Sequence, residues 1–537
     1  MAMRRSGVAI KRGVHRADCS WLALPLAVAF GLVSGRPADG QIFSGQTGAP
    51  IPGTENIKLG PGVDLSNWDT PGHVLEYAEL ASINLTGATF ANSDVQYASF
   101  FSSNLTSVNF SGALIQNTAF DGSLSYSQLI STASYADGDL TGTILFDLNL
   151  SGGNFNNFEL ADSSFSFTNV TGGNFSNSNL ANADLSSATL TNGTFANANL
   201  SAANVSYAIL ANAALTGSTL TAVNLSNANL TNASITGANL TNANLASSNL
   251  TGAFLTNANL ANANLSSANV TGCDFTGTNI VGASFAAATG LTTSQVYSTA
   301  SYASGNLSGV NLASASLIGG NFANQSLAGA NLSSAILTDG VFSNANLAAA
   351  NLSSANLTGA ELANANLSGA NLSSANLTAA DFTGTNIAGA SFAGATGLGA
   401  AQLYPTATYI NNGLAGINFS GVNLSGGNFS NRNLTSVNFT GATLDGANLT
   451  NANLTGATVQ AANLAGAIGF TANQLYSTAS YLAGSLTGVN FSGDDMNGWN
   501  FANENLSETN LTDSTLTNAN LTNCNLSNPI LSGADLT

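Results

Sequence analysis

The chain has 537 residues, of which 6% are charged and 44% are hydrophobic, and its formal net charge is −18. Six of its eight Lys and Arg residues lie in the first 36 positions. A surface that binds nucleic acid needs clustered Lys and Arg, so this composition excludes a phosphate-binding role, whereas the apolar fraction is ample for a large core.

The N-terminal segment, 1–40, has the pattern of a signal peptide. A basic stretch at 4–16 precedes an apolar stretch at 21–33, and small residues follow at 38–40. This pattern predicts a cleavable signal peptide over 1–40, with cleavage before Gln41. The apolar stretch is shorter than the ~20 residues needed to span a bilayer; an uncleaved membrane anchor is the alternative. We therefore expect a secreted or cell-envelope protein with no membrane span once the signal is removed.

Residues 41–64 are rich in Gly and Pro. These residue types interrupt regular secondary structure. We expect a linker or a loose N-terminal cap here, with repeats beginning near Leu65 or Leu80.

A five-residue period dominates the rest of the chain. A large apolar residue, called the centre here, follows a small residue by two positions and usually Asn by one, and Ser or Thr comes next. Neither a helix nor a flat strand keeps a stripe of this period on one side. A backbone that turns a corner at every repeat does, and four such sides make a coil of four repeats that can bond to the next coil. In the clearest stretch, the structural column centres are Leu225, Leu230, Ile235, Leu240, Leu245 and Leu250.

This pattern resembles the pentapeptide-repeat family, whose motif is A-(D/N)-L-x-x. The resemblance covers nearly all of the chain after about residue 65, and the phase is unbroken from Leu140 to Phe285. It implies an all-β fold, a right-handed quadrilateral parallel β-helix, that is, a pentapeptide-repeat solenoid. Asp replaces Asn before some centres, for example at Asp184 and Asp274, as the family motif allows.

Four breaks interrupt the repeats, and they resemble one another in sequence. Three begin with Ser or Thr followed three positions later by Gln, which is a capping-box pattern, so we expect a short helix of one or two turns in each break. The flanking centres, such as Phe120 with Leu140 and Phe285 with Leu307, are separated by the length of a coil or slightly more, so we expect each break to take about one coil. The predicted organisation is repeat block 1 (65–124), followed by blocks that each start with a break: block 2 (125–291), block 3 (292–398), block 4 (399–470) and block 5 (471–537).

A bulky or charged residue occupies the small inward position once after each break. We interpret these four as junction-filling residues, which stack over a small residue one coil earlier; a functional site is the alternative. The junction residues are Phe158, Gln325, Arg432 and Glu504, and the positions four repeats earlier are Gly138, Gly305, Asn412 and Gly484.

Few residues could carry chemistry. His73 is the only His after the predicted signal, and Cys273 and Cys524 occupy small inward positions, where we interpret them as buried space-fillers. The neighbouring Asp494 and Asp495 indicate a local distortion of the coil rather than a catalytic pair. Catalysis needs converging titratable groups, so we expect no enzyme, no catalytic, cofactor or metal residues, and no cofactor.

The sequence leaves the biological role open. The first hypothesis is an exported, non-enzymatic structural or interaction scaffold that presents flat Asn, Ser and Thr ladders and either self-associates or contacts an envelope or extracellular polymer. The alternative is a protein that binds polysaccharide or ice surfaces. A remote alternative comes from the resemblance, because some pentapeptide-repeat proteins mimic DNA and inhibit type II topoisomerases. Sparse acidic charge and predicted export argue against mimicry, and we expect no nucleic-acid partner.

Overall fold

The structure is a computed structural model that describes residues 41–66, 68–70 and 73–537. The predicted signal peptide at 1–40 lies outside these residues. The chain divides into two compact units, Met1–Asn169 and Val170–Thr537. The division falls inside predicted block 2, and each unit is described by itself below.

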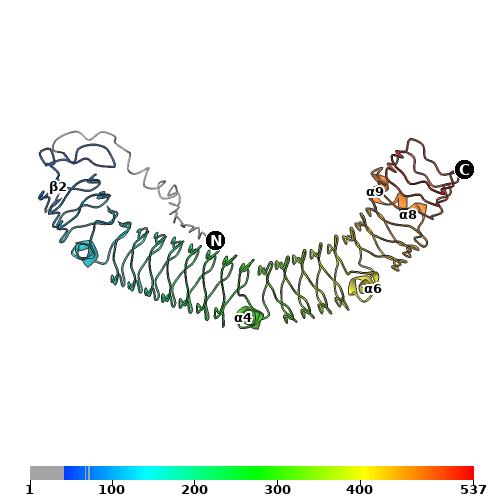
Figure 1. The fold of residues 1–537 in the computed structure, drawn as a ribbon, viewed down its shortest axis with the longest axis horizontal. Helices are drawn as coiled ribbons and strands as arrows, with labels where there is room; N and C mark the ends of the chain where they lie inside the picture. The colour runs from blue at the N-terminus through cyan, green and yellow to red at the C-terminus, as the bar shows by residue number, and fades with distance from the viewer. Residues whose placement is uncertain (1–40, 67, 71–72) are drawn as a thin grey trace, which may run out of the picture. The chain divides into compact units, whose positions relative to one another are not determined.

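Away from the breaks, backbone hydrogen bonds join the repeats of unit 2 to those four before and four after them in the chain, which gives the stacked coils of Figure 1. Leu225 donates its N–H to the carbonyl of Asn244 (2.7 Å). On the other side, Asn229 donates to the carbonyl of Ala208 (2.9 Å). Parallel bridges such as Asn224↔Asn244 recur with this spacing on successive sides of the coil. The fold is therefore a repeat β-helix, a solenoid in which each side is too short to form a long strand.

The centres form the apolar interior. The six centres at Leu225 to Leu250 are at most 1% exposed, and the small residues two positions earlier, such as Ala228, are equally buried. In unit 1 several centres are aromatic, and neighbouring rings there alternate between stacked and edge-to-face contacts with centroids 5.2–5.7 Å apart. Because every coil adds side chains to the same interior, burial is shared along the stack rather than concentrated in one globular core.

After nearly every described centre, the second residue turns the corner in the left-handed region. Asn227 has φ 59° and Asn232 has φ 55°. Gly and Asn adopt this conformation at low cost, whereas most L-residues do not. This requirement explains the frequent Asn, Gly and Ser at the corner, a preference that the sequence analysis did not interpret.

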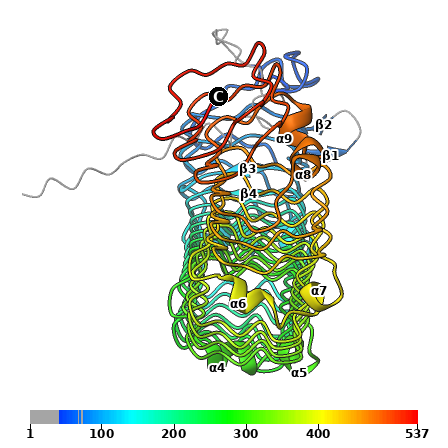
Figure 2. The ribbon, with the colours of Figure 1, turned by 90° about the vertical axis from the view of Figure 1, so that its right-hand side faces the viewer.

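Each break contains two short helices, where the sequence predicts one. Figure 1 shows α4 and α6 on the outside of the coils of unit 2, and Figure 2 shows α6 and α7 at one level of that stack. Ser or Thr caps the N-terminus of every helix except α6, which begins after Gly399. The helices are α2 (Tyr126–Leu129) and α3 (Ala133–Ala136) in unit 1, and α4 (Thr293–Tyr297), α5 (Ala300–Ala303), α6 (Ala400–Leu403), α7 (Ala407–Ile410), α8 (Ala472–Tyr476) and α9 (Ala479–Leu482) in unit 2.

The breaks take more chain than the one coil that the spacing of the flanking centres predicts. Phe120 does not stack on Leu140, the first centre after the break; instead β3 (Ala119–Phe120) pairs in parallel with β4 (Ile144–Leu145), which contains the next centre. At the breaks of unit 2 the pairing also skips one centre, as when Ser284 pairs with Asn311. A coil with a break is thus longer than a regular coil by at least one repeat. The extra residues form the short helices, which lie outside the path of a regular coil. The coils continue past the breaks within each unit, and a buried helical residue fills the interior at each: Leu129, Val296, Leu403 and Leu475.

The segment before the repeats packs on the first coils of unit 1. Ile42 and Ile51 are buried, and Gly45 donates its N–H to the carbonyl of Tyr77 (2.7 Å). A small antiparallel hairpin, β1 (Asp69–Thr70) with β2 (His73–Val74), interrupts the first coil. Residues 42–57 are therefore an ordered cap held by apolar contacts and backbone hydrogen bonds.

Candidate functional surfaces and break junctions

The Asn residues before the centres hold the outer turn of their own repeat. The side-chain oxygen of Asn229 accepts hydrogen bonds from the backbone N–H of Thr231 (3.1 Å) and from its hydroxyl (2.6 Å). The same arrangement recurs along both units. An Asn or Asp side chain bonded to the backbone two residues on stabilises a tight turn, so this position carries the local bend of the repeat.

The same Asn side chains also connect successive coils. In unit 2 one ladder joins Asp184, Asn204, Asn224, Asn244 and Asn264 through amide-to-oxygen hydrogen bonds of 3.0–3.2 Å. Across the second break, Asn311 donates to the hydroxyl of Ser284 (3.1 Å), and that hydroxyl bonds to the hydroxyl of Ser266 (2.8 Å) rather than to Asn264. Since these polar atoms bond to one another, the ladder primarily holds the coils together and presents a regular, nearly neutral surface.

A glutamine anchors every break to the coil before it. The side-chain oxygen of Gln295 accepts from the backbone N–H of Thr292 (2.8 Å), and its nitrogen donates to the carbonyls of Val270 (2.9 Å) and Cys273 (3.1 Å). The capping-box pattern revealed the first of these bonds, but not the two to the preceding coil. Gln128, Gln402 and Gln474 make the equivalent contacts.

A pair of tyrosines replaces the missing strand beside each break. Tyr297 accepts a hydrogen bond from the backbone N–H of Asn321, and Tyr302 donates to the carbonyl of Asn321 (2.8 Å). Asn321 is bridged on its other side to Val341. Both backbone groups facing the break are therefore satisfied by phenol hydroxyls. Sequence analysis missed this role, although the recurrence of Tyr in every break was a usable signal. The other pairs are Tyr126 with Tyr135, Tyr404 with Tyr409, and Tyr476 with Tyr481.

The four junction residues each lie against the second tyrosine of the preceding break. The Phe158 ring is 4.9 Å from the Tyr135 ring, centroid to centroid. Gln325 donates through Nε2 to the Tyr302 carbonyl (3.1 Å). A Cβ on Gly138 would lie 3.6 Å from the Phe158 ring, whereas at Gly305 and Gly484 the nearest atom is a backbone oxygen at 3.7 Å.

The third and fourth junctions carry charged side chains. Arg432 donates through Nη1 to the Tyr409 carbonyl (2.9 Å), and its guanidinium carbon lies 4.0 Å from the centre of the Tyr409 ring. Glu504 is 5% exposed and close to Tyr481, whose pKa is raised by burial and by the neighbouring Tyr476, Glu504 and Cys524. Burial raises the pKa of Glu504 to about 7.

A few buried polar atoms in the described part of the chain have no hydrogen-bond partner. They are Gln325 Oε1, Arg432 Nε, Asp494 Oδ2 and Glu504 Oε2, so three of the four belong to junction residues. Burial also raises the pKa of Asp494 to about 7, although the backbone N–H of Gly466 donates to its other oxygen (3.0 Å). Asp495 is exposed, and the two neighbouring carboxylates do not form a paired site.

An exposed aromatic cluster lies on the surface of unit 1. The Phe146 ring contacts the rings of Phe101 and Phe167, with centroids 5.7 and 5.4 Å away. Phe101 is 39% exposed and Phe167 is 45% exposed. Contiguous exposed aromatic side chains are typical of interaction surfaces. Sequence analysis did not single out these residues because none is a centre.

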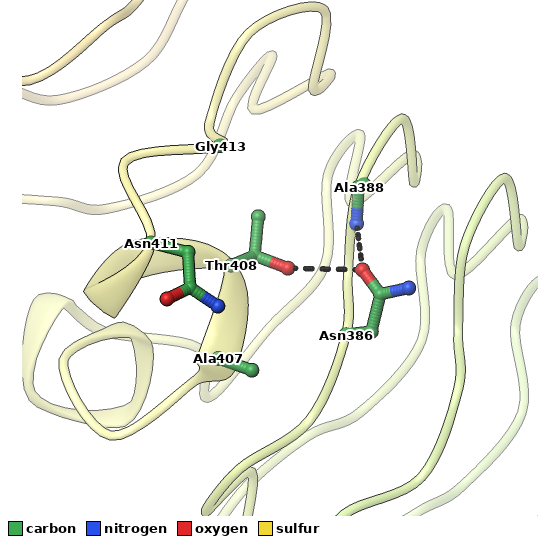
Figure 3. Close-up of a pocket in the computed structure, with 6 residues that line it drawn as sticks. All are labelled: Asn386, Ala388, Ala407, Thr408, Asn411 and Gly413. Atoms are coloured by element: carbon green, nitrogen blue, oxygen red, sulfur yellow. Dashed lines mark hydrogen bonds between the residues drawn. The ribbon is translucent and has the colours of Figure 1, made fainter.

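A pocket of about 370 Å³ lies beside α7 (Figure 3). Its lining includes Asn386 and Asn411, and the Asn386 oxygen accepts from the hydroxyl of Thr408 (3.2 Å) and the N–H of Ala388 (3.2 Å). The lining contains no titratable side chain. The pocket therefore offers hydrogen-bonding groups, but no acid or base that would activate the hydroxyl of Thr408.

The described residues bring no catalytic or metal-binding set together. No three His, Cys, Asp or Glu side chains in the described ranges are close enough to hold a metal ion. Cys273 is buried, which raises its pKa to about 12, and Cys524 is half-buried; both are free thiols. None of the helices that the structure describes has the length and apolar character to cross a membrane.

These features define a class of protein, the β-helical solenoids built from short repeats. The family model described as pentapeptide repeats matches in eight copies, and a related model for a pentapeptide repeat region matches 315–392; together they cover more than half of the chain. The chain belongs to the pentapeptide-repeat family. No curated protein matches it. The eight copies lie in 75–122, 159–197, 198–237, 238–277, 414–441, 433–468 and 505–537.

Several solved structures of pentapeptide-repeat proteins are similar to the chain. HetL of Nostoc sp. strain PCC 7120, a protein involved in heterocyst differentiation regulation, is 25% identical, with a TM-score of 0.24, over 51% of this chain and 96% of HetL. Rfr23 of Cyanothece 51142 is 26% identical, with a TM-score of 0.12, over 27% of this chain and 89% of its own. A protein of the Arabidopsis thaliana thylakoid lumen is 26% identical, with a TM-score of 0.09, over 25% and 68%.

Proposed function

We propose that this protein is an exported, non-enzymatic interaction scaffold. The observation that supports it most is the side-chain ladder that runs from Asp184 to Asn264, because it makes a regular outer surface of hydrogen-bonded side chains. The interior is filled by the centres, so partners have only the outer surface to contact. Membership in a family of repeat proteins is consistent with a structural role.

The proposed scaffold is a right-handed, four-sided coil with short helical breaks. Support comes from the bridges, which within a repeat block join a repeat to the fourth one after it, and from the left-handed corners between successive centres; a coil of four sides would have both features. A crystal structure of the mature protein tests the hand and the number of sides. A three-sided or left-handed coil would contradict the proposal.

Export is part of the proposal, supported by the basic and apolar segments before residue 41. The test is fractionation of the native cells with N-terminal sequencing of the protein. A mature chain that starts near Gln41 in the envelope or the medium is the expected result. A full-length protein in the cytosol would overturn export and leave the scaffold role to be tested against intracellular partners.

Self-association is the proposed mode of assembly. The side-chain ladder repeats the same amide and hydroxyl groups on successive coils, so the ladder of a second copy of the chain can pair with it along the outer surface. Sedimentation over a hundredfold range of protein concentration should show a concentration-dependent dimer. A monomer at every concentration would contradict self-association.

The second candidate is binding of a polysaccharide, which the cluster of Phe101, Phe146 and Phe167 favours. Aromatic rings can pack on the apolar faces of sugar rings while neighbouring polar groups bond to hydroxyls. The mature protein should be retained on an immobilised glycan, and a double variant, F101A with F167A, should lose retention. Equal retention of the variant would dispose of this candidate, as would absence of retention from a panel of envelope and extracellular glycans.

A further inference from the structure

The four junctions have the same geometry but different side chains. Each junction residue lies 23 positions after the second tyrosine of its break. At the second and third junctions the side chain donates a hydrogen bond to this carbonyl, from Gln325 to Tyr302 and from Arg432 to Tyr409. At these two junctions, the polar side chain therefore acts as a hydrogen-bond donor to the tyrosine carbonyl.

The fourth junction holds a group that donates only when it is protonated. Glu504 stands where Gln325 and Arg432 stand, and an ionised carboxylate has acceptors alone. Its backbone keeps the regular pattern, because Glu504 N–H bonds to Phe501 O (2.9 Å) and Asn525 N–H bonds to Glu504 O (3.0 Å). The side chain thus occupies the buried inward position, which Gln325 occupies at the second junction.

Within 41–66, 68–70 and 73–537, no Lys or Arg side chain is placed to stabilise an ionised Glu504. The sequence after residue 40 contains only two basic side chains of the Lys or Arg type, Lys58 and Arg432, and Arg432 belongs to another junction. The titratable groups that face Glu504 are Tyr481 on α9 and Cys524 on the next coil, and burial raises the pKa of each. Glu504 is only 5% exposed, and its Oε2 has no partner. Burial of an unpaired charge is far more costly than burial of a neutral acid.

We propose that Glu504 is held as a neutral carboxylic acid that donates a hydrogen bond to the Tyr481 carbonyl, so that the last break of unit 2 is a proton-controlled joint. The Tyr481 oxygen already accepts from Gly484 N–H (2.8 Å), as the Tyr302 oxygen accepts from Gly305 N–H (2.9 Å) beside its bond from Gln325. A carbonyl has two lone pairs, so the second bond is available. Loss of the proton removes that bond and places the Glu504 carboxylate against the Tyr481 carbonyl oxygen. Because both groups are acceptors, they repel each other, and the contact between α9 and the coil that contains Glu504 loosens.

The direct test is the titration of Glu504 in the full chain labelled with ¹³C at the Glu carboxyl, with the spectrum of E504Q used to identify its signal. The expected midpoint is about 7, compared with 4.5 for an ordinary Glu. A midpoint near 4.5 would overturn the proposal, because the acid would then be ionised at neutral pH.

Hydrogen exchange of residues 478–505 tests the consequence. With a midpoint of about 7, the neutral fraction falls about tenfold between pH 6 and pH 8, and protection should fall with it after correction for the intrinsic exchange rate. E504Q should retain its protection at both values, because an amide donates at any pH. Asp494 lies in the same block and has a raised pKa, so D494N is the control that should keep the pH dependence.

The reverse substitution makes the test specific to the junction. Q325E places a carboxylic acid at the second junction, and residues 299–326 should then lose protection between pH 6 and pH 8 as the wild-type fourth junction does. Protection in Q325E that does not depend on pH, or loss of the wild-type dependence in D494N rather than in E504Q, would overturn the proposal.

Discussion

Replacing the anchoring glutamine of the second break should open that break selectively. The Gln295 side chain makes three hydrogen bonds to backbone groups, one accepted from Thr292 N–H and two donated to the carbonyls of Val270 and Cys273. At about 1 kcal/mol each, their loss in Q295A costs about 3 kcal/mol of local stability. Local opening then becomes about a hundredfold more frequent.

An isosteric variant sharpens this prediction. In Q295E the ionised side chain still accepts from Thr292 N–H, but it no longer donates and it places negative charge beside two carbonyl oxygens. We therefore expect Q295E to open residues 292–305 at least as often as Q295A does, although the side chain keeps its shape. S294A, at an exposed position of the same helix, is the matched control and should have little effect.

Hydrogen exchange with mass spectrometry is the suitable assay, because long repeat arrays need not unfold in one cooperative step. Peptides over 292–305 should lose about two orders of magnitude of protection in both Gln295 variants, while peptides over 170–250 stay unchanged. Wild-type protection in Q295E would refute the reasoning, since it would mean that the two donated bonds do not hold the break.

Three further perturbations follow from the repeat itself. L240A removes a fully buried centre and should cost about 2–5 kcal/mol of local stability by exchange, whereas the surface change N242S should be nearly neutral. N227V puts a β-branched residue at φ 59° and should lower the melting temperature, whereas N227G should not; equal melting temperatures would contradict the corner assignment. Folded Glu504 and Asp494 bind protons more tightly than the unfolded chain does, so stability should fall as pH rises from about 4 to about 7 and level off above that, as followed by chemical denaturation. The double variant E504Q with D494N should flatten this slope, and an unchanged slope would show that other groups cause it.

The coil was predictable because its cause is local. Each repeat carries its own centre, small inward residue and turn-forming Asn, so the repeat at Leu240 contains the same information as the repeat at Leu245. The capping boxes at the breaks were visible for the same reason, since the cap and its partner are only three positions apart. Burial of the centres then follows from the period alone.

Contacts between coils were not predictable in this way. The spacing of the flanking centres predicted that each break takes one coil. After the break, however, the coil before it pairs with the second centre rather than the first. This pairing depends on how the chain after the break packs on the preceding coil. The tyrosine pairs form hydrogen bonds with backbone groups that lack a neighbouring strand only once the coils have stacked. At the second break these groups are the N–H and the carbonyl of Asn321.

The sequence by itself determined the repeat, the column of centres and the unusual residues at the four junctions, because each pattern can be recognised within one or two coils of sequence. Only the tertiary structure decided what those junction residues contact. Gln325, Arg432 and Glu504 are far from their tyrosines in sequence, and each meets its tyrosine once a coil has closed. The charge state of Glu504 depends on that closure, because burial among neutral groups, rather than residue type, sets the cost of ionising a carboxyl.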